Sequence, residues 1–358
     1  MKKILTFVSW LSVLVLWGCS ALVYVNPAHW GKYWAVICLG FPLCVAAVLV
    51  SLVLCLLFRP KLALISVVGL LGCCGSLREY CPINLTSPPP KGAIKVLSYN
   101  TMSWDSWALD QDSNHYEVVQ YVCSERPDVA CLQEVLFRSD DEASRIERQF
   151  KRSGYTFVTA FVGANRVGIV SRWPVVKQEV VTHSESNGAV AFYLLPRRAD
   201  TLIVVSAHLE SMRLSQDERD GYHTLVKNPD EVEAVHGKLA LLQKIATGGE
   251  RRALQADTLA AFIDRHAGQK FIVMGDFNDT PISYAHHQVC SRLTDCYRAT
   301  GNGIGRSFNR DAIYVRIDNI FCSSHFKPFA MKVDKTVPFS DHYPILGWLQ
   351  PITGGRMK

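Results

Sequence analysis

The chain has 358 residues, 49% of them hydrophobic, and a formal net charge of +6 at pH 7. The hydrophobic share is high enough to suggest that part of the chain is embedded in a membrane. The charge is modest for this length, and the sequence has no run of Lys or Arg of the kind that marks a nucleic-acid-binding arm or a polybasic lipid patch. Charge alone therefore names no partner.

The front of the chain, residues 1–80, is predicted to be a transmembrane anchor with three apolar spans at about 4–25, 34–58 and 62–77. The first two runs are long enough to cross a bilayer core of roughly 30 Å, whereas the third has only about 16 residues. A signal peptide is the alternative for the first run, but its apolar part is longer than usual and a second span follows at once. A Pro-rich linker, residues 81–92, then leads to a catalytic domain predicted over residues 93–350.

Few basic residues accompany the apolar runs, and their places predict the orientation. Lys2 and Lys3 precede the first run, and Arg59 and Lys61 lie between the second and the third. Because cytoplasmic loops are rich in Lys and Arg, both places are expected on the cytoplasmic side. Three spans then put the catalytic domain on the non-cytoplasmic side, whereas two spans put it inside the cell.

The globular part interleaves short strands with helices. Strands are predicted at 93–99, 129–132, 157–161, 167–171, 175–181, 189–195, 202–206, 271–274, 317–321 and 345–349. Helices are predicted at 116–123, 142–151 and 253–266. This order indicates an α/β fold of two packed sheets with helices on their outer faces. Residues 208–269 are a long, polar, mostly helical insert between two strands.

Polar side chains follow several of these strands directly. Asn100 follows the first strand, Glu134 follows the second, and Asp276 with Asn278 ends the strand at 271–274. Any turn favours Asn, Asp and Gly at such a place, so each residue alone has a structural explanation. Several such strand ends together indicate side chains that reach a shared cleft.

The residue types in this cleft favour a hard divalent cation. Mg²⁺ and Mn²⁺ bind carboxylates, amide oxygens, water and substrate phosphate, which Glu134, Asn100 and the Asp residues can supply. The cysteines outside the apolar part lack the paired spacing of a zinc site, and Cys290 and Cys296 either form a local disulfide or are separate thiols. Hydrolysis of a phosphate ester also needs a positioned water and donors to the developing oxyanion.

The remaining candidates are placed for these tasks. Asp276 can orient the water, and the Asn278 amide can donate to the oxyanion. Asp318 is placed to hold one imidazole nitrogen of His342 and fix its tautomer, which leaves the other nitrogen for the phosphate. His208 is the second imidazole at a strand end, where it would contact a phosphate oxygen.

Six motifs follow one another along the globular part: Ser98-Tyr99-Asn100, Leu132-Gln133-Glu134, Ala207-His208-Leu209, Gly275-Asp276-Phe277-Asn278, Arg316-Ile317-Asp318 and Ser340-Asp341-His342. In this order they resemble the signatures of the endonuclease/exonuclease/phosphatase superfamily, which includes deoxyribonuclease I, the exonuclease III type of abasic-site endonuclease, neutral sphingomyelinases and inositol polyphosphate phosphatases. The resemblance spans residues 95–349 and implies a four-layer α/β sandwich, two packed mixed sheets flanked by helices, with the site at one edge.

The resemblance also implies which residues bind metal. Glu134 is then the principal ligand of Mg²⁺ or Mn²⁺, with Asn100 and Asp341 near the same ion or a second one. Residues 167–174 match a strand-and-turn segment that we interpret as structural. Asn319 stands where Tyr is common after the Arg-Ile-Asp motif, a departure that removes no catalytic group.

The catalytic roles implied by the resemblance fall on five further positions. His208 and His342 contact the scissile phosphate, and Asp318 pairs with His342. Asp276 with Asn278 handles the attacking water and the transition state.

Together these features predict a membrane-anchored, metal-dependent phosphoesterase that hydrolyses a phosphodiester or phosphomonoester by metal-assisted attack of water. The substrate is a nucleic acid, a lipid head group or a soluble phosphate ester, and the lipid bilayer is the other expected partner, with no obligate protein partner evident. With its spans the chain resembles membrane-anchored bacterial members, which implies a multi-pass protein of the inner membrane. The alternative is a catalytically silent, membrane-tethered binding module, against which the complete set of catalytic positions speaks.

Overall fold

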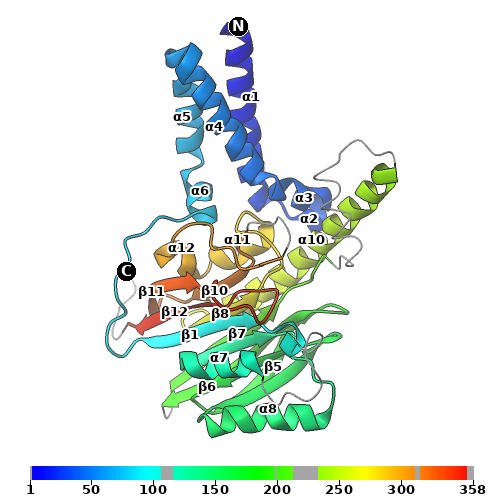
Figure 1. Cartoon of the computed structure of the whole chain (residues 1–358), viewed down its shortest axis with the longest axis vertical. Coiled ribbons are helices and arrows are strands. Elements are labelled where there is room, and N and C mark those ends of the chain that lie inside the picture. Colours follow the sequence, from blue (N-terminus) through cyan, green and yellow to red (C-terminus); the bar gives the residue numbers. More distant parts are fainter. Residues whose placement is uncertain (1, 106–115, 198–199, 213–232, 311–314, 353–358) are drawn as a thin grey trace. The chain divides into compact units, whose positions relative to one another are not determined.

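The computed structural model of the chain describes residues 2–105, 116–197, 200–212, 233–310 and 315–352 (Figure 1). The chain divides into two compact units. The first comprises residues 1–81, 212–254 and 279–287, and the second comprises residues 82–211, 255–278 and 288–358. The long helix α10 (Glu233–Arg265) contributes its first part to one unit and its last part to the other.

The first unit contains three helices that pack side by side, α1 (Lys2–Ala21), α4 (Phe41–Phe58) and α5 (Ala63–Gly72) (Figure 1). Short helices connect them, η1 (Leu22–Tyr24), α2 (Pro27–Trp30), α3 (Tyr33–Leu39) and η2 (Pro60–Leu62), and α6 (Cys74–Tyr80) follows α5. Among the described residues, two helices are long and apolar enough to cross a membrane, Lys2–Tyr24 and Phe41–Phe58. Pro60–Gly72 and Cys74–Tyr80 add a third only if this pair, bent by 62°, is one span.

Small and hydroxyl-bearing residues allow these three helices to approach closely. Ser9 Oγ lies 2.8 Å from Ser51 Oγ, and Ser66 Oγ donates to Ser51 Oγ at 3.5 Å. A Cβ on Gly69 would lie 2.4 Å from a methyl group of Val13, so only glycine fits there. Small residues at close contacts and hydroxyl groups that bond across helices are typical of helices that associate within a bilayer.

The predicted second span, 34–58, is two helices in the structure. α3 ends at Leu39, and α4 begins at Phe41 after Gly40. Pro42 lies in the first turn of α4. Proline lacks a backbone N–H and is tolerated in the first turn but not in a helix interior, which explains why a new helix begins here.

The described part of the second unit contains two six-stranded sheets, with strand orders β11-β12-β1-β2-β4-β3 and β5-β6-β7-β8-β10-β9. One central pair in each sheet is parallel, β1 with β2 and β7 with β8, and the other pairs are antiparallel. The first sheet comprises β1 (Ile94–Asn100), β2 (Val129–Gln133), β3 (Thr156–Val162), β4 (Asn165–Ser171), β11 (Phe326–Val333) and β12 (Ile345–Pro351). The second comprises β5 (Val175–His183), β6 (Gly188–Arg197), β7 (Asp200–His208), β8 (Lys270–Asp276), β9 (Thr294–Asp295) and β10 (Asp318–Cys322).

Buried apolar side chains fill the space between the sheets, among them Val96 from the first and Phe192 from the second. Helices α7 (Glu117–Glu125) and α8 (Asp140–Arg152) cover the outer face of the first sheet, where Val122 and Phe150 pack with Leu97. Successive residues of a strand point to opposite faces of the sheet. One strand therefore supplies side chains both to the core between the sheets and to the core beneath the helices.

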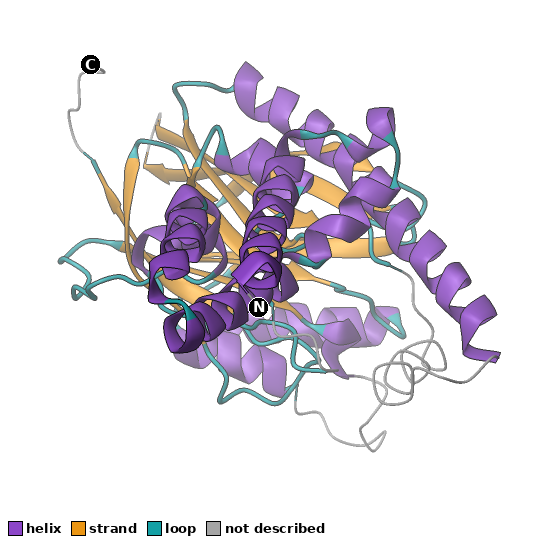
Figure 2. Cartoon of the chain, turned by 90° about the horizontal axis from the view of Figure 1, so that it is seen from above, coloured by secondary structure: helices purple, strands orange, loops and turns teal. Residues whose placement is uncertain are grey.

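The outer face of the second sheet is covered by the last part of α10. The Phe262 ring lies 6.0 Å, between centroids, from the ring of Phe271 on β8. The predicted arrangement of two packed mixed sheets with helices outside is therefore confirmed, and Figure 2 shows strands between helices. The shorter elements η3 (Met102–Asp105), α11 (Tyr284–Cys290) and α12 (Cys296–Thr300) complete the described chain.

Sequence patterns predicted most strands to within two residues but not β9 or β11. Pro328 lies within β11, and the register of this strand shifts between Phe329 and Lys332. Proline is tolerated here because β11 is an edge strand, where a backbone donor has no partner to lose. Of the predicted helical insert, residues 213–232 lie outside the described residues, and α10 forms most of the remainder. Cys290 and Cys296 are free thiols.

Candidate active site

Strand register places the predicted polar residues at one edge of the two sheets. β1 and β2 are parallel neighbours, so Asn100 at the end of β1 lies beside Glu134, which directly follows β2. On the second sheet, His208 pairs with Asp276 in the parallel β7–β8 ladder, and Asp318 pairs with Asp276 in the antiparallel β8–β10 ladder. Paired residues of neighbouring strands point to the same side, so register alone clusters these three side chains.

Gly275 is required for this register. It has a φ of +152°, and a Cβ at this position would lie 1.8 Å from the carbonyl oxygen of Ala207. Any side chain would thus push β7 and β8 apart next to His208 and Asp276.

Asn100 joins the two sheets through its side chain. It is 1% exposed, and its Nδ2 donates to Glu134 Oε1 at 3.1 Å and to Asp276 Oδ2 at 3.2 Å. Its Oδ1 accepts from the backbone N–H of Met102 at 3.1 Å. These contacts fix two carboxylates relative to one another, and the role of the Asn100 oxygen as a metal ligand stays a prediction.

Glu134 has a left-handed backbone conformation, with a φ of +54°. Its carbonyl oxygen accepts from Thr101 Oγ1 and from the backbone N–H of Ser103, both at 3.0 Å. Non-glycine residues adopt this conformation at a cost, which the surrounding hydrogen bonds offset. The carboxylate thereby lies 3.7 Å from His208 Nε2, and its side chain is 31% exposed, so a ligand can reach it.

His342 is held by Asp318, as predicted. Its Nδ1 lies 2.9 Å from Asp318 Oδ2, and its Nε2 lies 3.7 Å from Asp276 Oδ2. Burial opposes the charged form, but the nearby carboxylates, Asp318 foremost, outweigh burial and raise the pKa of His342 well above its usual value. Its imidazolium can therefore donate from Nε2 at neutral pH.

His208 has the opposite electrostatic character. Burial lowers the pKa of His208, which favours the neutral ring. Asn165 Nδ2 lies 3.4 Å from His208 Nδ1 and is a donor, so Nδ1 accepts and Nε2 carries the proton. Nε2 lies 3.7 Å from both Glu134 Oε1 and Asp276 Oδ2.

Asp276 lies at the centre of these contacts. Its Oδ2 accepts from Asn100 and faces both imidazoles, and its Oδ1 accepts from the backbone N–H of Asn278 at 2.7 Å. Burial raises the pKa of Asp276 to about 6, with His342 acting in the opposite direction.

The other two predicted residues lie at the margin of this network. Asn278 Nδ2 donates to the carbonyl oxygen of Leu209 at 3.0 Å, so its amide stabilises the connection after β7, and its predicted role at the oxyanion stays a prediction. Asp341 Oδ1 lies 3.5 Å from Ser340 Oγ, which donates to the carbonyl oxygen of Asn100 at 2.8 Å. Asp341 is thus linked to the site through Ser340.

The residues present fit a hard divalent cation. The carboxylates of Glu134 and Asp276 share the Asn100 amide and the His208 imidazole as neighbours. Ligand atoms of Asp276, Asp318 and His342 lie within 4.8 Å of one another. Asp318 Oδ1 is buried and has no hydrogen-bond partner among the described residues. A buried carboxylate oxygen without a donor is suited to a cation or a metal-bound water.

Two residues that orient the site were not among the predicted candidates. Asn165, which sets the tautomer of His208, begins β4 just before the segment interpreted as structural. Ser340, which bonds to Asn100 and accepts from the backbone N–H of His342 at 3.2 Å, lies within a recognised motif. Their proximity to motif residues was the only available signal, because their partners come from distant strands.

Comparison with known families gives two matches. The model of the family described as the Endonuclease/Exonuclease/phosphatase family matches residues 102–342. A second model, described as a domain of unknown function, matches residues 2–80. No curated protein matches the chain.

Solved structures share the fold of the second unit at low sequence identity. An endonuclease/exonuclease/phosphatase from Beutenbergia cavernae DSM 12333 has a TM-score of 0.51 and 16% identity, over 72% of each chain. The catalytic domain of human Nocturnin with bound sulfate anion has a TM-score of 0.51 and 15% identity, over 75% of this chain and 96% of that one. The 3'-5' exonuclease NExo from Neisseria meningitidis has a TM-score of 0.50 and 17% identity, over 72% of this chain and 99% of that one.

Proposed function

The chain belongs to the endonuclease/exonuclease/phosphatase family, and on this basis we propose that it is a divalent-metal-dependent phosphoesterase. Enzymes of this family are hydrolases that act on phosphoesters and are usually metal dependent. The observation that carries the proposal is the position of Asp276, whose Oδ2 faces Asn100, His208 and His342 at once. A silent binding module would have no need for this arrangement around a buried carboxylate.

Glu134, with Asn100 and Asp341, would hold Mg²⁺ or Mn²⁺ at the ends of β1 and β2. The bound cation would supply charge to neutralise the phosphoryl oxygens. The partly exposed Glu134 carboxylate opens the site on this side, whereas Asn100 and Asp276 are buried and fixed.

The two imidazoles and Asp276 would carry out the remaining steps. Nε2 of His342, held by Asp318 through Nδ1, and Nε2 of His208 can donate to oxygens of the scissile phosphate. Asp276 Oδ2 can orient the attacking water and accept its proton. Cleavage of the ester bond then gives an alcohol and a phosphate, with the substrate drawn from nucleic acids, lipid head groups or soluble phosphate esters.

Metal-dependent hydrolysis tests the proposal directly. The full chain, purified in detergent, is expected to hydrolyse bis-p-nitrophenyl phosphate or plasmid DNA with Mg²⁺ or Mn²⁺. EDTA is expected to remove the activity, and excess Mg²⁺ to restore it, as release of p-nitrophenol at 405 nm would show. A chain that is folded, metal-loaded and inactive toward these and toward sphingomyelin and inositol phosphates would instead support the binding module.

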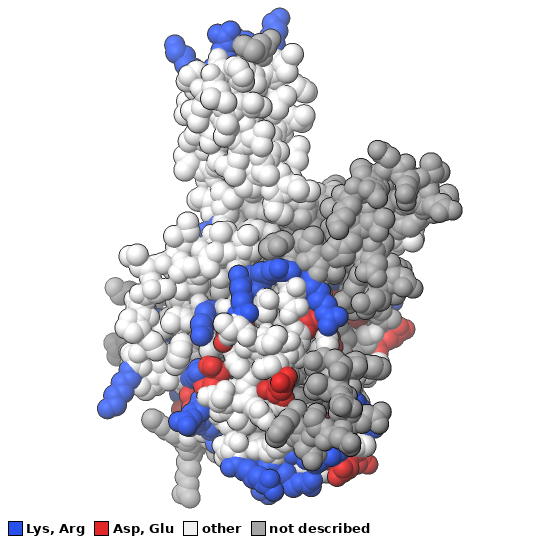
Figure 3. All heavy atoms as spheres, in the orientation of Figure 1, with Lys and Arg blue, Asp and Glu red and all other residues white. Residues whose placement is uncertain are grey.

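Residues 2–80 of the first unit are proposed to anchor the protein in a lipid bilayer, as a multi-pass protein of the bacterial inner membrane. The start of α1 and the connection between α4 and α5 lie at the same end of the three helices (Figure 1). Figure 3 shows Lys and Arg gathered at that end and an uncharged surface along the helices. Lys2, Lys3, Arg59 and Lys61 are the basic residues of these segments, and such clusters favour the cytoplasmic side.

This orientation predicts the location of everything after residue 81. If the bent pair of α5 and α6 completes a third crossing, a reporter fused after residue 90 is expected outside the cytoplasm. Alkaline phosphatase fused there would be active and green fluorescent protein dark. The reverse pattern would rule out the three-span arrangement.

A further inference from the structure

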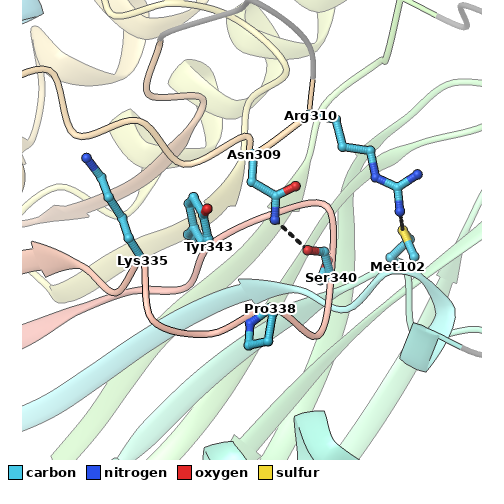
Figure 4. Close-up of a pocket in the computed structure, with 7 residues that line it drawn as sticks. All are labelled: Met102, Asn309, Arg310, Lys335, Pro338, Ser340 and Tyr343. Carbon is cyan, nitrogen blue, oxygen red and sulfur yellow. Dashed lines mark hydrogen bonds between the residues drawn. The ribbon is translucent and has the colours of Figure 1, made fainter.

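A pocket of about 210 Å³ adjoins the candidate site in the second unit (Figure 4). We infer that it binds a second phosphate group of the substrate, next to the phosphate that is cleaved, an inference that rests on the proposed phosphoesterase activity. At about 30 Å³ for each water molecule, the pocket has room for a phosphate and part of its carrier. It is lined by Met102, Asn309, Arg310, Lys335, Pro338, Ser340 and Tyr343.

The pocket shares its wall with the candidate active site. Ser340 Oγ donates to the carbonyl oxygen of Asn100 at 2.8 Å and accepts from the backbone N–H of His342 at 3.2 Å. The backbone N–H of Met102 donates to Asn100 Oδ1 at 3.1 Å. A ligand in this pocket would therefore lie beside a phosphate held by His342, within the reach of one substrate molecule.

Two cationic side chains flank the pocket. Figure 4 shows Arg310 and Lys335 on opposite sides, with Asn309 and Tyr343 between them. Both are exposed, and among the described residues neither forms an ion pair with a carboxylate. The neighbouring carboxylate of Asp334 accepts instead from Tyr121 at 3.1 Å and from Thr336 at 2.6 Å. Two cations around one hollow, each without a carboxylate partner among the described residues, favour an anion, and Arg and Lys are side chains that bind phosphate.

The loops that carry these groups are held by hydrogen bonds. Asn309 Nδ2 donates to the carbonyl oxygen of Ser340 at 2.7 Å. The backbone N–H of Asn309 donates to the carbonyl oxygen of Asp341 at 2.9 Å. Arg306 Nε donates to the carbonyl oxygen of Phe308 at 2.8 Å. Binding would thus require the ordering of side chains rather than of backbone, which lowers its entropic cost.

A pair of substrates that differ only in a second phosphate tests the inference. The p-nitrophenyl ester of thymidine 5'-phosphate is compared with the same ester that also carries a 3'-phosphate, as the nucleic-acid arm. Glycerophosphoinositol with and without a ring phosphate is the lipid-head-group arm. For the full chain in detergent, the second phosphate is expected to lower KM about tenfold in one arm, consistent with charge-assisted contacts. The arm that shows this effect identifies the source of the phosphate.

Variants separate the pocket from the reaction itself. Arg310→Ala and Lys335→Ala are expected to abolish the KM advantage of the second phosphate and to leave bis-p-nitrophenyl phosphate hydrolysis unchanged. Lys332→Ala is the matched control, because Lys332 is exposed, lies on the nearby β11 and does not line the pocket. No advantage in either arm, or an equal advantage in all variants, would overturn the inference. Failure of the proposed function is distinguishable, because the wild type would then leave bis-p-nitrophenyl phosphate intact.

Discussion

Glu134→Ala and His342→Ala are each expected to lower kcat for bis-p-nitrophenyl phosphate by about 10³-fold or more. Loss of Glu134 removes the carboxylate that is fixed by Asn100 and open to a cation, and loss of His342 removes the donor that Asp318 orients. Removal of a single preorganised donor to a transition-state oxyanion costs about 10²–10³ in kcat, and loss of a metal ligand adds to this. Initial rates at saturating Mg²⁺ measure the effect.

Controls distinguish lost chemistry from lost structure. Glu147→Ala changes an exposed carboxylate on α8 and is expected to retain wild-type rates. Near-UV circular dichroism verifies that each variant is folded. If folded Glu134→Ala and His342→Ala enzymes have wild-type kcat, the assignment of the site is wrong.

Asp295→Ala is expected to lower the free energy of unfolding of the second unit by about 3–5 kcal/mol, because it leaves a buried guanidinium without its counter-charge. Arg316 is fully buried, and its Nη2 lies 2.7 Å from Asp295 Oδ2. Asp295 Oδ1 also accepts from the backbone N–H groups of Tyr297 and Arg298, at 2.9 and 3.0 Å, and thereby caps α12. For a unit of this size, the midpoint of thermal unfolding would fall by roughly 10 °C.

An exposed ion pair provides the matched control. Arg292 Nε donates to both oxygens of Asp264 at 2.9 and 3.0 Å, but the Asp264 side chain is 57% exposed. Asp264→Ala is expected to cost less than about 1 kcal/mol, since water screens such pairs. Thermal unfolding followed by near-UV circular dichroism compares the two variants, and equal shifts would show that the Arg316–Asp295 pair adds nothing beyond a surface contact.

Arg316 of the same buried pair also contacts Asn319. Asn319, which stands where the family commonly has Tyr, accepts a short hydrogen bond from Arg316 Nη1 and donates to the carbonyl oxygen of Ile317 at 2.9 Å. The Arg-Ile-Asp motif thus combines a structural cation with the carboxylate that holds His342. Asn319 is therefore a partner of Arg316, and Asp318 keeps its contact with His342.

The sequence by itself determined the α/β class of the second unit, whereas the predicted division of the chain at residues 80 and 93 stays a prediction. Apolar runs and period-two strands reflect burial, which depends on local composition and needs no knowledge of distant partners. The six ordered motifs identified the family. Two of them contain Asp318 and His342, so the pairing of these residues could also be predicted. The number of spans among the described residues, in contrast, is two or three, depending on whether the bent pair Pro60–Gly72 and Cys74–Tyr80 is one span.

The tertiary structure alone decided which residues fix the geometry of the site. Asn165 sets the tautomer of His208, Ser340 bonds to the end of β1 at Asn100, and Asp295 neutralises Arg316, yet each has an ordinary residue type for a turn or strand end. Their partners lie 20 or more positions away, and strand register brings them together. A hydrogen bond depends on distances of about 3 Å between atoms, which composition and periodicity do not specify.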